Sequence, residues 1–274
     1  MPLDLPAVPD AATILETLRR VRFASETLAK PLSPEDCMLQ SMEDASPVKW
    51  NLAHTTWFFE TFILLPYSPG YEEFHPDFGY LFNSYYNRVG VMHPRPIRGL
   101  VSRPSLEDVK AYRMHVNEAL MRFVEKADAE TLENVSLLLA TGCAHEQQHQ
   151  ELLLTDLQHA MSVNPLKPAV YKEDDCGESA ATALEWVRQP GGLVEIGATG
   201  KGFAFDNEGP RHKTHLLPYF LANRLVTNGD YLGFMEDGGY DNPDHWFSDG
   251  WDIVCRENWN APLYWRKKDG AWRQ

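Results

Sequence analysis

Apolar residues recur every three or four positions through roughly the first 160 residues, which is the spacing of amphipathic helices. Pro31 ends the first apolar segment, and Pro66 is expected to end the second, because a proline ring cannot continue a helix. Ser105 opens a third segment whose S-x-x-D form, completed by Asp108, indicates a capping box. The pattern predicts four long helices, over residues 11–30, 47–65, 105–123 and 130–161. Such a set is typical of a four-helix bundle.

The connection between the second and third helices, residues 66–104, is long and rich in proline, glycine, tyrosine and arginine. Connections of this length inside a compact domain are more often functional than idle. From Gly191 onward, glycine, asparagine and tryptophan become frequent, and short β-type segments such as 193–196 alternate with turns. Helical character is scarce there, apart from residues 227–237.

These patterns divide the chain into two folded parts. They predict a helical bundle over residues 1–165, a linker over 166–190 and a second domain of α+β character over 191–274. Large aromatic residues, Trp265 and Trp272, stand close to the end of the second domain. We therefore expect that domain to be the first part of a longer one.

The charge balance narrows the classes of partner. Lysine and arginine number 25 against 39 aspartate and glutamate, a formal net charge of −14, and such a surface repels nucleic acids and anionic membranes. The sequence shows neither a secretory signal nor an apolar run of the ~18 residues that a membrane span needs, so we expect a cytoplasmic protein. Without C-x-x-C spacing, the cysteines are expected to be buried free thiols. They are Cys37, Cys143, Cys176 and Cys255.

Histidines indicate a metal site in the bundle. His145 and His149, in the string CAHEQQHQELL, lie four residues apart and therefore on one side of a helix, a spacing suited to holding one ion. Gln148 flanks the same face. His54 stands among apolar residues in WNLAHTTWFF, where its ring nitrogens need a partner other than water. A metal ion bound by all three would satisfy it.

The same string contains H-E-x-x-H, the motif of zinc peptidases in which the glutamate, here Glu146, acts as general base. A third zinc ligand is expected downstream. His159 lies ten residues after His149 without the intervening glycine, and Glu173 follows a helix break, so neither fits well. Three neutral histidines instead suit Fe(II) and leave three adjacent octahedral positions open, which favours oxygen-dependent chemistry.

Several separated motifs together resemble one known family. They are W-N-L-A-H-T-T-W-F-F-E, H-E-Q-Q-H-Q-E, the loop L-F-N-S-Y-Y-N-R-V-G with H-P-R-P-I-R-G-L, and the later F-D-N-E-G-P-R-H and V-T-N-G-D-Y-L-G-F-M-E-D-G-G-Y. The chain is similar in these motifs to the ergothioneine-biosynthesis sulfoxide synthases (EgtB type). The resemblance implies a DinB-like four-helix bundle followed by a domain like formylglycine-generating enzyme, a variant of the C-type lectin fold.

The resemblance also implies an activity. Such enzymes join the sulfur of a thiol to the imidazole of hercynine, using O2 and a non-haem Fe(II), and give a sulfoxide. The family's iron ligands fall on His54, His145 and His149, and its hercynine contact falls on Gln148. The thiol substrate would be cysteine or γ-glutamylcysteine.

Four loop residues carry further implied roles. Arg95 and Arg98 fall where the family binds the carboxylate of the thiol, a task for which the forked guanidinium is well shaped. Tyr85 and Tyr86 resemble the tyrosine pair of the branch that uses free cysteine, where a phenol donates a proton so that sulfoxidation wins over thiol dioxygenation.

Family members continue well beyond the end of this sequence, and the later part of their second domain closes over hercynine. The resemblance therefore implies a truncated domain whose remainder is either a separate partner or absent. Two alternatives stay open: an ovothiol-type synthase that couples cysteine to unmethylated histidine, and a DinB-like module that binds metal without catalysis.

Overall fold

The computed structural model describes residues 10–171, 182–200 and 202–273. The chain forms two compact units, one comprising Met1–Glu173 with Gly197–Arg211 and the other Asp174–Ile196 with His212–Gln274. The expected fold class, a helical bundle followed by an α+β domain, is confirmed. In the described part of the chain, no helix is both long enough and apolar enough to cross a membrane.

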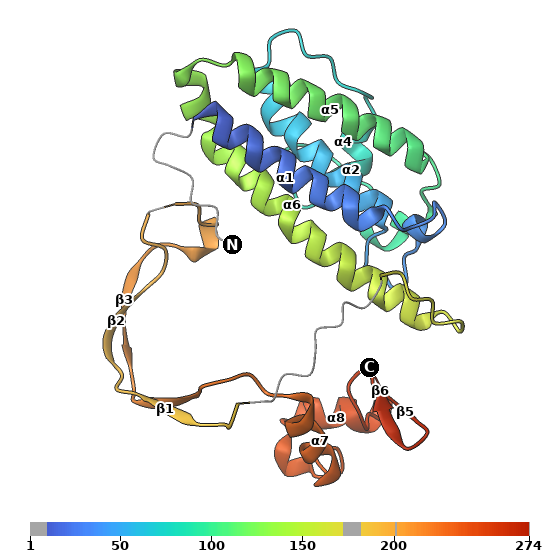
Figure 1. Ribbon diagram of the computed structural model, residues 1–274, viewed down its shortest axis with the longest axis vertical. Helices are drawn as coiled ribbons and strands as arrows, with labels where there is room; N and C mark the ends of the chain where they lie inside the picture. The colour runs from blue at the N-terminus through green and yellow to red at the C-terminus, as the bar shows by residue number, and fades with distance from the viewer. Residues whose placement is uncertain (1–9, 172–181, 201, 274) are drawn as a thin grey trace. The chain divides into compact units, whose positions relative to one another are not determined.

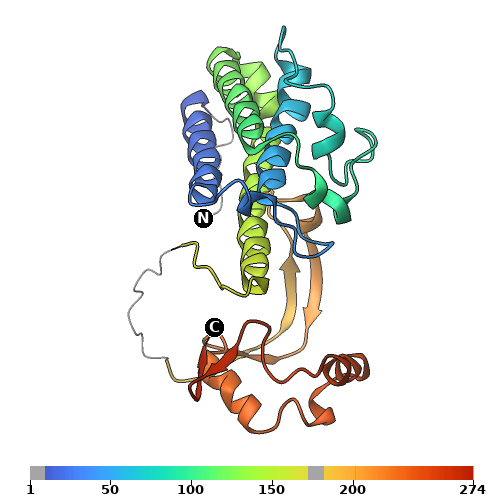
Figure 2. The same cartoon turned by 90° about the vertical axis from the view of Figure 1, so that its right-hand side faces the viewer.

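Four long helices lie side by side in both views of the first unit (Figures 1 and 2). Helix α1 packs against α6, α6 against α2, and α2 against α5. Their inward faces form one apolar core cluster. The helical elements of this unit are α1 (Ala11–Ala29), η1 (Asp36–Met38), α2 (Val48–Phe59), η2 (Glu60–Leu64), α3 (Leu65–Tyr67), α4 (Phe78–Phe82), η3 (Arg95–Leu100), α5 (Leu106–Lys126), α6 (Ala129–Val163) and η4 (Asp206–Glu208).

The helices begin where polar caps precede apolar runs. The carboxylate of Asp10 accepts hydrogen bonds from two backbone N–H groups at the start of α1. The capping box expected at α5 is present, with the Ser105 side chain accepting from the Asp108 backbone N–H and the Asp108 carboxylate accepting from the Ser105 N–H. The Asp128 carboxylate caps α6 by accepting a hydrogen bond from the Thr131 backbone N–H.

The helical run that begins with α2 ends at Tyr67, one residue beyond Pro66 and close to the end that the sequence predicted. A π-helical segment, η2, follows α2 without a break, and the short helix α3 carries Pro66 in its first turn. The continuous run of α2, η2 and α3 thus ends within one residue of the proline, because a proline ring cannot continue a helix. The rest of the connection lies on the side of the bundle opposite α1 (Figure 2). There the Lys49 ammonium donates to the carbonyls of Val101, Ser102 and Pro104, which anchors the loop end to α2.

The second unit is built from two-stranded antiparallel ribbons and short helices. Strand β1 pairs with β4, β2 with β3, and β5 with β6. Gly191, with a φ of 70°, stands where a Cβ would lie 2.5 Å from the Leu216 carbonyl oxygen, so only glycine fits this bend. The elements are β1 (Trp186–Gln189), β2 (Gly192–Ile196), β3 (His212–Leu216), β4 (Tyr219–Ala222), α7 (Asn228–Glu236), η5 (Pro243–His245), α8 (Ser248–Glu257), β5 (Arg266–Lys268) and β6 (Ala271–Arg273).

The expected strand at 193–196 and helix at 227–237 are confirmed as β2 and α7, but the sequence did not indicate α8. The expectation of buried thiols holds for Cys37 and Cys143 and is wrong for Cys255, which is exposed on α8. Cys176 lies outside the described residues.

Candidate metal centre

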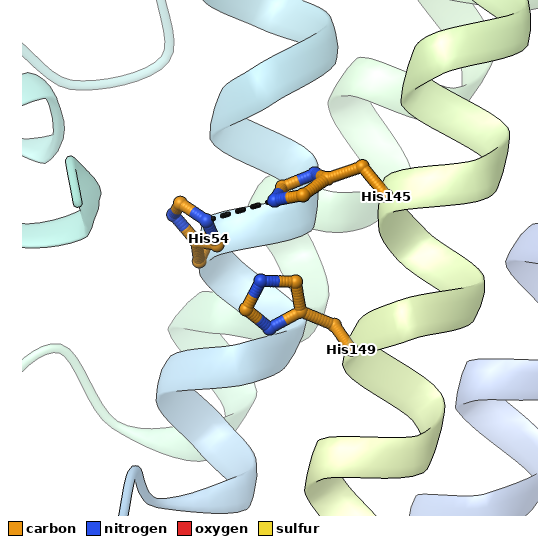
Figure 3. Close-up of side chains that lie close together, drawn as sticks. All are labelled: His54, His145 and His149. Atoms are coloured by element: carbon orange, nitrogen blue, oxygen red, sulfur yellow. Dashed lines mark hydrogen bonds between the residues drawn. The ribbon is translucent and has the colours of Figure 1, made fainter. Parts of the chain in front are cut away.

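Two helices bring three imidazoles to one point. His54 projects from α2, and His145 and His149 project from successive turns of α6, with all three rings directed into the space between the helices (Figure 3). One ligand nitrogen from each ring lies within 4.8 Å of the other two. The Nε2 atoms of His54 and His145 are 3.1 Å apart.

The outer ring nitrogens fix the tautomers of two of these histidines. His54 Nδ1 lies 2.5 Å from the Phe82 carbonyl oxygen, and His149 Nδ1 lies 2.8 Å from Asn51 Oδ1. The Asn51 amide nitrogen donates to the Ser46 carbonyl, so its oxygen is the atom that faces His149. Because both oxygens can only accept, both Nδ1 atoms carry the proton. Each Nε2 lone pair therefore points inward.

All three imidazoles are neutral at ordinary pH. Burial, with the neighbouring histidines, lowers the pKa of His54 well below its usual value. Burial likewise lowers the pKa of His145 to about 4, and burial with nearby His145 and Arg98 lowers the pKa of His149 to about 3. Neutral imidazole is the form that binds metal ions.

The donor set fits a metal ion. With its proton on Nδ1, His54 can accept a hydrogen bond from His145 Nε2, and a cation in place of that proton would be bound by both nitrogens. Imidazole nitrogens suit Fe, Zn, Cu and Ni, and a three-nitrogen set leaves coordination positions for other ligands. Outer-shell hydrogen bonds from a ligand's second nitrogen, as at His54 and His149, are usual for metal-binding histidines.

Two tryptophan rings stack on His54. The Trp50 ring stacks on the imidazole with centroids 4.6 Å apart and planes 14° apart, and the Trp57 ring stacks on it at 5.5 Å and 17°. The Trp50 indole N–H donates to the Leu81 carbonyl, which fixes that ring in turn. His54 thus has little rotational freedom, and its Nε2 stays directed toward α6.

The glutamate of the H-E-x-x-H string points away from the histidines. Glu146 is fully buried and accepts hydrogen bonds from Arg22, Arg113 and Ser25. Burial alone would raise the pKa of this carboxyl, but the two arginines and the Ser25 hydroxyl hold the pKa at about 2. A carboxylate fixed in this way does not act as the general base of a zinc peptidase. His159 bonds to Ser41 through its Nδ1.

Arg98, one of the two loop arginines, is buried against an aromatic ring. Arg98, only 3% exposed, lies with its guanidinium carbon 3.4 Å from the Trp50 ring centroid and donates to the hydroxyls of Ser46 and Ser84. Burial and nearby Arg95 lower the pKa of Arg98 to about 10, so it stays charged. Among the described residues, Arg98 has no carboxylate partner. A buried cation of this kind, next to a ring that stacks on His54, attracts anions.

The tyrosine pair is split between surface and interior. Tyr85 is 74% exposed, has a φ of 62°, and accepts a 2.5 Å hydrogen bond from Arg95. Tyr86 is half-buried, and its ring packs against Trp57 and Phe58, which in turn contact His54 and His145. Burial raises the pKa of Tyr86. Gln148 is exposed on α6, three residues after His145.

Sequence reasoning missed the residues that support the histidines. Asn51 precedes His54 by three positions and therefore shares its helix face, a spacing that could have identified it. Arg22 and Arg113 stand at core positions of their helices, 2% exposed each, and a charged residue in an apolar stripe is itself a signal of a buried partner. The sequence does not identify that partner, because it depends on how the helices of the bundle pack.

Comparisons with known proteins match this architecture. The family model of the DinB superfamily matches residues 17–153, half of the chain, and that of the sulfatase-modifying factor enzyme 1-like domain matches residues 172–274. A hercynine oxygenase of Mycolicibacterium thermoresistibile is 28% identical over 279 residues, covering 94% of this chain and 56% of the relative. That of Mycolicibacterium smegmatis is 27% identical over 256 residues, covering 91% and 54%.

A hercynine oxygenase of Mycobacterium tuberculosis is 27% identical over 227 residues, 81% of this chain and 50% of the relative. The chain spans about half the length of the curated relatives that it matches. Its two matched regions occur in the order that the sequence motifs predicted. The chain belongs to the DinB superfamily, and its pairing of that bundle with a sulfatase-modifying factor enzyme 1-like domain makes it an EgtB-type protein.

Proposed function

We propose that this protein is a non-haem Fe(II)-dependent sulfoxide synthase that uses O2 to couple the sulfur of cysteine, or of γ-glutamylcysteine, to the imidazole of hercynine. The observation that carries the proposal is the convergence of three neutral imidazoles from α2 and α6. The relatives' names, hercynine oxygenase, support the oxygen-dependent class. Because the chain spans about half of those relatives, the complete activity is a proposal.

His54, His145 and His149 would hold the iron. When bound, the iron supplies the activation of O2 and a site for the thiol sulfur. The protein's own contribution is to keep the three imidazoles neutral and directed inward, which the Phe82 carbonyl and the Asn51 amide support.

Arg98, with Arg95 beside it, would bind the carboxylate of the thiol substrate. Its guanidinium is buried and charged and lacks a carboxylate partner among the described residues, so a substrate carboxylate would supply the missing counter-charge. Gln148 would orient hercynine, because an exposed amide one turn from His145 can donate to an imidazole nitrogen as well as accept from one.

Tyr86 is our candidate for the proton donor. Burial raises the pKa of its phenol, which therefore holds its proton at neutral pH, and its ring lies against the aromatic residues that contact the histidines. Tyr85 would act from the surface by holding Arg95. A phenol that delivers a proton would favour sulfoxide formation over oxidation of the thiol alone.

The wider assignments remain part of the proposal. They are the domain boundaries at 1–165, 166–190 and 191–274 and a cytoplasmic location.

The test of the activity is an oxygen-uptake assay. The protein is loaded anaerobically with Fe(II), given cysteine and hercynine, and exposed to O2, and products are identified by mass spectrometry. We expect uptake only with both substrates and a sulfoxide product. A module that only binds metal gives no uptake, an ovothiol-type synthase prefers histidine to hercynine, and a zinc enzyme retains stoichiometric zinc. Each of these three results would contradict the proposal.

A further inference from the structure

A buried polar cluster joins the two helices that carry the histidines. It consists of Arg22 from α1, Arg113 from α5 and Glu146 from α6. Each of these side chains is at most 3% exposed. The cluster lies beside the candidate metal site in sequence, since Glu146 directly follows His145. Because Glu146 faces away from the imidazoles, the cluster is separate from the three ligands.

Arg22 spans both histidine-bearing helices with one rigid group. Its Nη1 donates to Glu146 on α6 at 2.9 Å, and its Nη2 donates to the Thr56 hydroxyl on α2 at 3.0 Å. These contacts fall one residue after His145 and two residues after His54. Because a guanidinium is planar and stiff, the distance between its two partners is set by the group itself.

Arg113, from α5, makes a second bridge between the same two helices. Its Nη2 donates to Glu146, while its Nη1 lies 3.3 Å from the hydroxyls of Thr55 and Thr56 and 3.4 Å from the Leu52 carbonyl oxygen. Two guanidinium groups therefore tie the same carboxylate on α6 to the same turn of α2. The Ser25 hydroxyl, which donates to Glu146 at 2.6 Å, adds a contact from α1.

Every guanidinium nitrogen of the cluster already has a protein partner. The remaining two, both Nε atoms, donate to Asn117 and Glu26 at 2.6 and 3.1 Å.

Fixing Glu146 also fixes the rotation of α6 about its axis. Successive helical residues are about 100° apart, so His145 stands at a set angle from Glu146. At a helix radius of about 5–6 Å, a rotation of about 10° moves a side-chain tip by about 1 Å. Metal sites tolerate about half of that.

We propose that Arg22, Arg113 and Glu146 are positioning residues for the metal centre: they set the rotation and spacing of α6 relative to α2, so that the three imidazoles meet before metal binds. This inference rests on the proposed metal site. It distinguishes the cluster from an ordinary stabilising ion pair, because it predicts an effect on metal geometry beyond the effect on stability.

The experiment compares two buried carboxylates. Glu146→Gln removes the charge that both arginines share. The matched control is Glu60→Gln, in the π-helical segment that continues α2; Glu60 is also buried and accepts from Tyr71 at 2.6 Å and Tyr112 at 2.5 Å. Both variants and the wild type are titrated anaerobically with Fe(II) and with Co(II), whose visible absorption spectrum reports coordination geometry, and their thermal unfolding is measured.

We expect Glu146→Gln to weaken metal affinity by about 10- to 100-fold, the range typical of outer-shell changes, and to alter the Co(II) spectrum. Glu60→Gln is expected to lower the Tm and leave affinity and spectrum unchanged. Arg22→Lys, which keeps the charge but cannot reach both helices at once, is expected to fall between them and serves if Glu146→Gln does not fold.

The measurements distinguish a failure of the proposed function from a failure of the positioning role alone. If the wild type binds no metal, or binds it equally well after His54→Ala, the proposed function is wrong and the inference falls with it. If the wild type binds through the histidines but Glu146→Gln and Arg22→Lys keep its affinity and spectrum, only the inference is wrong. An equal loss of affinity in Glu60→Gln would also overturn it, because the effect would then be one of general stability.

Discussion

Gly142 controls how closely α6 approaches α2, and its replacement by alanine should loosen the metal site. A Cβ at this position would lie 2.6 Å from Phe59 Cε1 and 3.1 Å from Phe58 Cε1, whereas ordinary contacts begin at 3.4 Å. Phe59 is fully buried and its ring lies beside the Arg22 guanidinium, so the ring has little room to move. The helices themselves must then separate, one turn before His145.

The expected magnitude follows from two opposing effects. Overpacking a core costs about 1–3 kcal/mol, while replacing glycine by alanine inside a helix returns about 1 kcal/mol. We expect a net loss of about 1 kcal/mol in the free energy of unfolding, or a fall of about 2–4 °C in Tm for a protein of this size. Metal affinity should fall by more than this stability change implies, because His54 and His145 move apart.

The matched control is Gly79→Ala. Gly79 lies in α4, and no heavy atom lies within 4 Å of the position that an added Cβ would take, so its replacement should leave stability and metal affinity unchanged or slightly improved. Anaerobic Fe(II) titration and thermal unfolding of both variants provide the comparison. If Gly142→Ala kept wild-type metal affinity, this close helix contact would not be what sets the histidine geometry.

Three further predictions concern the residues around the site. Tyr86→Phe should keep metal binding but shift products from sulfoxide toward oxidised thiol, whereas Tyr85→Phe should not, as product ratios by mass spectrometry will show. Arg98→Met should raise the KM for the thiol about 10- to 100-fold, the loss expected for one charge-assisted contact of about 1.5–3 kcal/mol; an unchanged KM would contradict the assigned role. Since Glu146 has a pKa of about 2 against an ordinary 4.5, its stabilising effect is present above pH 4.5 and lost as pH falls toward 2. Urea unfolding across that range should show wild-type stability falling relative to Glu146→Gln, and parallel curves would argue against a native carboxylate that stays charged.

The bundle was predictable because its signals are local. Apolar spacing and the cap at Ser105 lie within a few residues of the structure that they specify. Helix α8 lacks such signals at its start and along its length: Phe247 provides no side-chain cap, and Val254 is its only buried residue. No local sequence pattern indicated that the residues before Pro66 form a π-helical segment.

The candidate site was predictable only in part for the same reason. The spacing of His145 and His149 is a property of one helix, but the direction of Glu146 depends on which helices pack against α6. The H-E-x-x-H letters alone could not show that Arg22 and Arg113 occupy that side. Arg98 and Tyr86 were identified by resemblance, while their burial follows from the packing of the long connection on α2.

Iron binding by the wild type and by His54→Ala decides whether the three-histidine centre exists. Extended X-ray absorption at the iron edge of the anaerobically loaded wild type should show one iron bound by three imidazole nitrogens, one from α2 and two from α6. His54→Ala should lose stoichiometric iron binding while its bundle stays folded by circular dichroism. Unchanged iron uptake after that substitution would contradict the existence of this centre.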